Sequence, residues 1–151
     1  MANFRGHITA GVGVYLVLVV FFRLGTSSLA NHLVWFCAAC SGSLFPDIDI
    51  YSKGQRLFAK LLVLMILFCS MVQATVPALF CVFLGVSSFV LPHRSLFHNF
   101  FFVTALCGAV ILFCWHTAPG SLGVVLEAAS FFMAGVLSHL VLDKGCKKSL
   151  W

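Results

Sequence analysis

The side chains best suited to chemistry in this sequence are histidines and aspartates, which stand out in a chain with only 9% charged residues. The segment 92–99 holds two histidines and an arginine, and further histidines and aspartates lie near residues 7, 48 and 140. Imidazole and carboxylate together suit borderline divalent metals such as Zn²⁺, Mn²⁺ and Fe²⁺, whereas Ca²⁺ prefers oxygen ligands alone. The pattern therefore indicates a metal site, provided that the fold brings these side chains together.

Seven side chains form the candidate ligand set: His7, Asp47, Asp49, His93, His98, His139 and Asp143. Seven ligands are more than one tetrahedral ion needs. They suit one ion, or two ions that share Asp47 or Asp49 as a bridge and leave positions for water and substrate. Zn²⁺ is the preferred expectation, with Mn²⁺ and Fe²⁺ as alternatives.

Hydrolysis is the chemistry that such a site would support. A bound metal lowers the pKa of water to about 7, and a second ion about 3.5–4 Å away can hold the leaving oxygen. Arg94 could grip a phosphate with its bidentate fork, which a lysine would do less well. Arg94 and the potential bridging residue Asp49 are therefore the candidate catalytic residues.

The composition is that of an integral membrane protein. Hydrophobic residues make up 62% of the chain, against roughly 45–50% in soluble domains, and the mean hydropathy is +1.09. The apolar runs are evenly spread and leave no linker, so residues 1–151 are expected to form a single domain. The predicted fold is an all-α, polytopic helical bundle.

Six apolar segments are expected to cross the membrane, since a span needs about 20 mainly apolar residues. They are 8–23, 29–45, 57–72, 76–91, 97–115 and 122–142. The long run 57–91 is divided by a predicted turn near Pro77, because proline cannot continue the helical hydrogen-bond ladder. Gly11 and Gly13, with small residues at 38–42, are expected to allow close helix packing.

The distribution of lysine and arginine predicts the topology. Basic residues lie before the first span, after the second, between the fourth and fifth, and after the sixth, whereas the opposite side has only Arg23. By the positive-inside rule both termini are expected to be cytoplasmic. This placement also explains the net charge of +5 without a nucleic-acid partner.

With this topology, all three aspartates and four of the six histidines fall at the cytoplasmic face. His139 and Asp143 are four residues apart and so share one face of a helix. His32, His116 and Glu127 lie roughly 22–27 Å away along their helices, at a rise of 1.5 Å per residue, and are expected to be interfacial or packing residues.

Each motif also has an ordinary structural explanation. His98 and Asn99 could cap a helix, the segment 47–49 could be a turn after a proline, and His139 with Asp143 could be an isolated hydrogen-bonded pair. The convergence of all seven ligands favours the metal site over these explanations.

Two other features are less informative. Six of the seven cysteines lie in apolar segments, where they resemble small buried hydrophobes more than disulfide partners. The N-terminus has the outline of a signal peptide, but Arg23 interrupts the approach to the cleavage motif and removal would discard His7. We therefore expect the first apolar run to be a membrane span.

Four ordered motifs resemble those of the YdjM-like family of small inner-membrane proteins, described as predicted metal-dependent hydrolases. They are His7 with Gly11, the segment 44–49, the segment 93–99 and the segment 135–143. The resemblance implies a bacterial inner-membrane protein with metal ligands at the seven positions above. The order of these motifs also looks, more weakly, like that of the zinc-dependent phospholipase C group.

These observations predict a multi-pass hydrolase that cleaves a phosphoester or phosphodiester of a lipid or lipid-linked substrate at the cytoplasmic face. One alternative is a metal-ion or proton transporter or channel that uses the same side chains. Another is a non-catalytic scaffold in which a structural metal joins four helix ends. The sequence does not indicate an oligomeric state.

Overall fold

The computed structural model describes residues 4–22, 27–47, 55–56, 59–60, 63, 67 and 98–148. Four long helices occur in these ranges, with two short 3₁₀ helices, and no strand is found there. The helices are α1 (Phe4–Phe21), α2 (Leu29–Leu44), η2 (Phe45–Asp47), α5 (Phe100–Thr117), η3 (Pro119–Ser121) and α6 (Leu122–Lys148). The all-α prediction is therefore confirmed for the described part of the chain.

Three of the described helices are long and apolar enough to cross a membrane: Phe4–Phe21, Phe100–Thr117 and Leu122–Gly145. The helix α2 has only 16 residues, which is just below the usual length of a span. The predicted spans 57–72 and 76–91 lie almost wholly outside the described residues. The six-span count therefore stays a prediction.

Helix termini differ from the predicted span boundaries. Helix α1 begins at Phe4 rather than at residue 8, and α6 continues to Lys148 rather than ending at residue 142. Hydropathy marks only the apolar stretch of a helix, and both helices extend past it into polar residues. As a result His7 and Asp143 lie within helices, where their directions are fixed.

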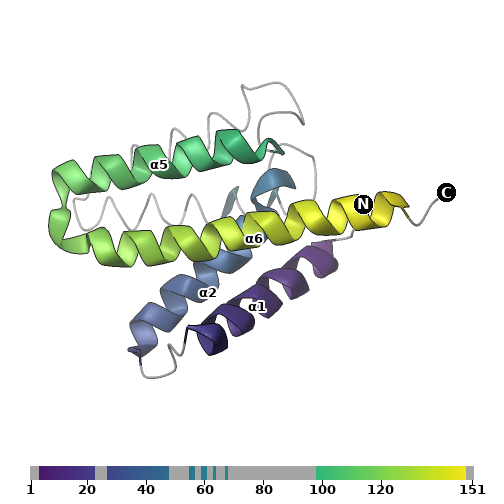
Figure 1. Cartoon of the computed structure of the whole chain (residues 1–151), viewed down its shortest axis with the longest axis horizontal. Helices are drawn as coiled ribbons and strands as arrows, with labels where there is room; N and C mark the ends of the chain where they lie inside the picture. Colours follow the sequence, from purple (N-terminus) through teal and green to yellow (C-terminus); the bar gives the residue numbers. More distant parts are fainter. Residues whose placement is uncertain are drawn as a thin grey trace.

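Helix α6 contacts each of the other three long helices, and α2 packs against both α1 and α6 (Figure 1). Helices α5 and α6 form an antiparallel hairpin joined through η3, and α5 contacts α6. The N-terminal end of α1 and the C-terminal end of α6 therefore lie at the same end of the bundle as the end of α2 and the start of α5.

Glycines set the close contact between α2 and α6. A side chain at Gly135 would collide with the backbone of Ala39 and would come within 2.9 Å of the Ser43 amide nitrogen. A side chain at Gly42 would collide with the backbone of Phe132. Inside a membrane, helices associate through such close contacts because the lipid is as apolar as the side chains.

Only one of the two glycines expected to pack α1 does so. A Cβ at Gly11 would lie 2.6 Å from Ser43 Oγ and 3.1 Å from the Cα of Cys40, so Gly11 is at the α1–α2 contact. A Cβ at Gly13 would have none of the described residues within 4 Å. The packing expectation for Gly13 was wrong, because Gly13 is turned away from α2 by two helical steps of about 100° each.

Two apolar clusters hold the helices together at different heights. One contains Phe45, Val103 and Val136, and it joins η2 and α5 to α6. The other contains Trp35 and Phe131, whose rings stack with centroids 5.4 Å apart at an interplanar angle of 5°. Both clusters consist of apolar residues. They therefore do not explain why histidines and aspartates gather at the end of the bundle where α1 begins and α6 ends.

We expect Gly135→Ala to destabilise the protein by about 1–3 kcal/mol, because the new methyl meets backbone atoms that cannot move aside. Gly108→Ala in α5 is the matched control, since its Cβ would meet none of the described residues within 4 Å. The control should be neutral or stabilising by up to about 1 kcal/mol. Thermal unfolding in detergent measures both, and equal midpoints would contradict the proposed close contact.

Candidate metal centre

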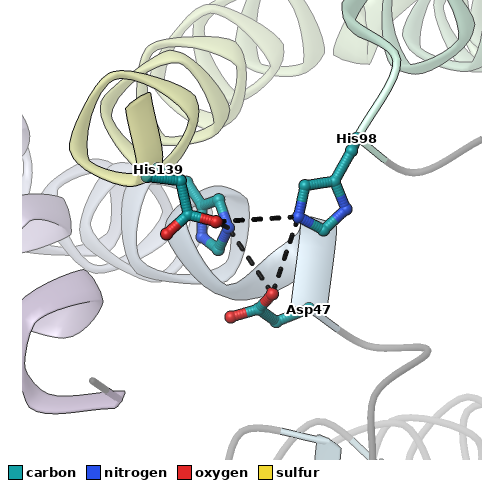
Figure 2. Close-up of side chains that lie close together, drawn as sticks. Asp47, His98 and His139 are labelled. Carbon is teal, nitrogen blue, oxygen red and sulfur yellow. Dashed lines mark ion pairs between the residues drawn. The ribbon is translucent and has the colours of Figure 1, made fainter. Parts of the chain in front are cut away.

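Five side chains from four parts of the chain meet at one end of the bundle. They are His7 from α1, Asp47 from η2, His98 from two residues before the start of α5, and His139 and Asp143 from α6, together called the His/Asp cluster. Figure 2 shows Asp47, His98 and His139 pointing toward one another from separate elements. The convergence expected from the spans is thus present for these five residues.

Local structure explains how each side chain reaches the cluster. Pro46 has no N–H to continue the α2 ladder, and the chain tightens into η2, which carries Asp47. Asn99 caps α5, because its side chain accepts hydrogen bonds from the amides of Phe101 at 2.9 Å and Phe102 at 3.4 Å. The cap fixes the start of α5 and thereby positions His98, which directly precedes Asn99.

The distances within the cluster are too long for direct hydrogen bonds. Six pairs join an imidazole Nε2 to a carboxylate oxygen, and they measure 3.6–3.9 Å. An N–H···O hydrogen bond is usually about 2.7–3.2 Å. Two ligands of one tetrahedral ion with bonds of about 2.0–2.2 Å lie about 3.3–3.6 Å apart. The observed spacing is therefore closer to that between ligands than to that between a donor and its acceptor.

Burial makes this spacing energetically significant. His7, His139 and Asp143 are 1%, 0% and 8% exposed. Within the described part of the chain, Asp47 Oδ1, Asp143 Oδ1 and the Nε2 atoms of His98 and His139 are buried without a hydrogen-bond partner. Each unsatisfied buried polar group costs about 1–3 kcal/mol, and more when it is charged. A cation bound between Asp47 Oδ1 and the Nε2 atoms of His98 and His139 would satisfy these three atoms together.

Four residues present a complete donor set for a single ion. One ligand atom from each of Asp47, His98, His139 and Asp143 lies within 4.8 Å of the other three. Two carboxylates balance the charge of one divalent ion, and the imidazoles favour a transition metal over Ca²⁺ or Mg²⁺. The residues present thus fit the metal that the sequence predicts, without deciding between zinc, manganese and iron.

A contact of its other ring nitrogen with the backbone fixes the orientation of His139. Its Nδ1 lies 2.8 Å from the backbone oxygen of Ser43, which leads us to place a proton on Nδ1 and the lone pair on Nε2. Ser43 is in the last turn of α2, where carbonyl groups lack intrahelical donors. Sequence reasoning missed Ser43, because a backbone carbonyl carries no signal in the residue types.

The remaining candidates divide into two groups. Asp49, His93 and Arg94 lie outside the described residues, so their predicted roles stay predictions. His32 and Glu127 have other partners. The hydroxyl of Tyr15 lies 3.0 Å from Nδ1 of His32. Nε1 of Trp35 donates a hydrogen bond to Glu127 at 3.2 Å. Both belong to the opposite half of the bundle, as expected.

The helices and the cluster define a membrane protein with a candidate His/Asp metal centre. The YdjM inner membrane protein family matches residues 1–149, so the chain belongs to that family. No curated protein matches the chain, and no solved structure matches it. The family assignment confirms the resemblance seen in the four motifs and leaves hydrolysis to be tested.

We expect Asp47→Asn and Asp143→Asn to weaken Zn²⁺ binding by at least about 100-fold, because each removes a negative charge from the donor set. Glu127→Gln is the control, since Glu127 bonds to Trp35 and is not part of the cluster. Competition titration against a chromogenic chelator gives the three affinities. Unchanged affinity in both aspartate variants would exclude this cluster as the metal site.

Proposed function

We propose that the protein is a membrane-embedded, metal-dependent hydrolase that cleaves a phosphoester or phosphodiester of a lipid-like substrate at the cytoplasmic face. The observation that carries the proposal is the uneven exposure of the donor set. The side chains of Asp47 and His98 are 24% and 21% exposed, whereas those of His7 and His139 are 2% and 0% exposed. Asp47 and His98 thus border the surface although their donor atoms are buried, so water and substrate would reach the metal past these two side chains, as a catalytic site requires.

The residues of the cluster would divide the work of such a reaction. A divalent metal held by these residues would supply hydroxide at neutral pH by lowering the pKa of water. Asp47 and Asp143 would neutralise such an ion, so that an anionic phosphate could approach without meeting net negative charge. On the strength of the sequence, Arg94 is proposed to bind the phosphate. Asp49 is proposed to supply a further carboxylate to the metal centre.

An apolar groove supports a lipid-like substrate. It lies between α1 and α6, has a volume of about 470 Å³, and is lined by Ala10, Gly13, Val14, Val17, Leu18, Ala134, Ser138, Val141 and Leu142. Ala10 is one helical turn after His7, and Leu142 directly precedes Asp143. From Ala10 to Leu18 the groove extends about 12 Å, at 1.5 Å per residue. A hydrocarbon chain there would begin beside the cluster.

The proposed cytoplasmic orientation follows from charge. Arg5 and Lys144 lie beside the cluster in the sequence, at the end where α1 begins and α6 finishes. By the positive-inside rule this end faces the cytoplasm. Asp47 and His98 both lie at this same end, as six alternating spans with two cytoplasmic termini require. A bacterial inner membrane is the proposed location, in keeping with the family.

Hydrolysis is tested with the purified protein in nanodiscs, supplied with Zn²⁺ or Mn²⁺ and either a phospholipid or a polyprenyl diphosphate. We expect release of a phosphorylated headgroup or of phosphate by the wild type, and a loss of at least about 100-fold in Asp143→Asn. Glu127→Gln should retain the wild-type rate. Metal uptake into proteoliposomes that depends on Asp143, without hydrolysis of either lipid, would instead establish a transporter.

The groove generates a separate expectation. Gly13→Leu would fill it, because Gly13 lines the groove and no described residue lies within 4 Å of a Cβ at this position. The KM for a long-chain substrate should rise by about tenfold, which corresponds to about 1.4 kcal/mol of lost apolar contact. Activity on a short, water-soluble phosphodiester should not change.

Gly108→Leu in α5 is the matched control, since its Cβ also meets nothing within 4 Å in the described part of the chain and Gly108 does not line the groove. Equal KM values for the long-chain substrate in the two variants would exclude the groove as the binding site of the chain.

A further inference from the structure

The two carboxylates of the His/Asp cluster each face histidines with both of their oxygens. Asp47 directs Oδ1 toward His98 and His139, at 3.7 and 3.6 Å from their Nε2 atoms. Its other oxygen, Oδ2, lies 3.8 Å from Nε2 of His7. The two oxygens of this carboxylate thus have different imidazole neighbours.

Asp143 repeats the arrangement from α6. Its Oδ2 lies 3.7 Å from His139 Nε2 and 3.9 Å from His98 Nε2, whereas its Oδ1 lies 3.7 Å from His7 Nε2. The cluster therefore divides into two groups of donor atoms. The primary position has Asp47 Oδ1, Asp143 Oδ2 and the Nε2 atoms of His98 and His139, and the second position has His7 Nε2, Asp47 Oδ2 and Asp143 Oδ1.

We propose that the second position binds its own divalent ion, and that Asp47 and Asp143 bridge it to the ion in the primary position. This division is more specific than the sequence allows, because residue types cannot show that Asp143 is a bridge or which histidine stands alone. The inference rests on the metal centre of the proposed function and does not depend on which reaction it catalyses.

The imidazole rings provide a second observation. His7 and His139 stack with centroids 3.9 Å apart and an interplanar angle of 16°. Their Nε2 atoms lie at equal distances, 3.7 Å, from opposite oxygens of Asp143, so the two nitrogens face this carboxylate side by side. Paired metal ions in hydrolytic enzymes are typically about 3.5–4 Å apart, which matches the ring separation.

The donor count also suits a pair of unequal ions. The primary position has four protein donors, the number found in tetrahedral zinc sites. The second position has three among the described residues, the number typical of catalytic zinc, whose remaining coordination position accepts water or substrate.

The experiment uses metal-depleted full-length protein in detergent, titrated with Mn²⁺ and followed by electron paramagnetic resonance. We expect the wild type to saturate at two ions with an exchange-coupled spectrum, and His7→Ala to saturate at one with the signal of isolated Mn²⁺. His7→Gln gives a milder substitution if alanine prevents folding. His32→Ala is the control and should keep two coupled ions, since His32 contacts Tyr15 outside the cluster.

Saturation of the wild type at one ion would overturn the inference, whatever the variants do. Retention of two coupled ions in both folded His7 variants would also overturn it, because the second ion would then have other ligands. The outcomes are separate from those of the lipid assay. Two coupled ions without hydrolysis would sustain the inference and refute the proposed function, and hydrolysis with a single ion would do the reverse.

Discussion

The close approach of α2 and α6 is the constraint on which both the bundle and the cluster depend. Gly42 and Gly135 bring the two backbones together, and a single methyl group at either position would meet backbone atoms of the other helix. The same approach places the backbone oxygen of Ser43 at 2.8 Å from Nδ1 of His139, which directs Nε2 into the cluster. Helix packing and the choice of imidazole tautomer are therefore set by one contact.

The polar groups in the two halves of the bundle are satisfied in different ways. At the end away from the cluster, Tyr15 pairs with His32 at 3.0 Å and Trp35 with Glu127 at 3.2 Å, which are ordinary hydrogen-bond lengths. In the cluster, the imidazole Nε2 atoms lie 3.6–3.9 Å from the carboxylate oxygens, which is longer than a hydrogen bond. Side chains that close could form hydrogen bonds by small rotations. Their spacing suits an ion between them, and such an ion would be part of the structure as well as of the chemistry.

The sequence predicted the location of the cluster better than its internal arrangement. Alternating spans and a fixed rise per residue were enough to place His7, Asp47 and Asp143 at one end and to exclude Glu127. They could not distinguish Gly11 from Gly13, because that difference depends on which face of α1 meets α2. Nor could they assign the separate oxygens of Asp47 and Asp143, since that depends on side-chain rotation in the folded protein. The motif that contains His93 and Arg94 was the most conspicuous in the sequence, yet His98 alone of its ligands is among the described residues.

Binding of a transition metal by the His/Asp cluster is tested most directly by X-ray absorption spectroscopy of the protein as purified, with elemental analysis of the same sample. The predicted result is a stoichiometric transition metal whose first shell contains nitrogen and oxygen at about 2.0–2.2 Å, with outer scattering from imidazole rings. A protein without stoichiometric metal, or a first shell of sulfur at about 2.3 Å from the cysteines, would contradict it.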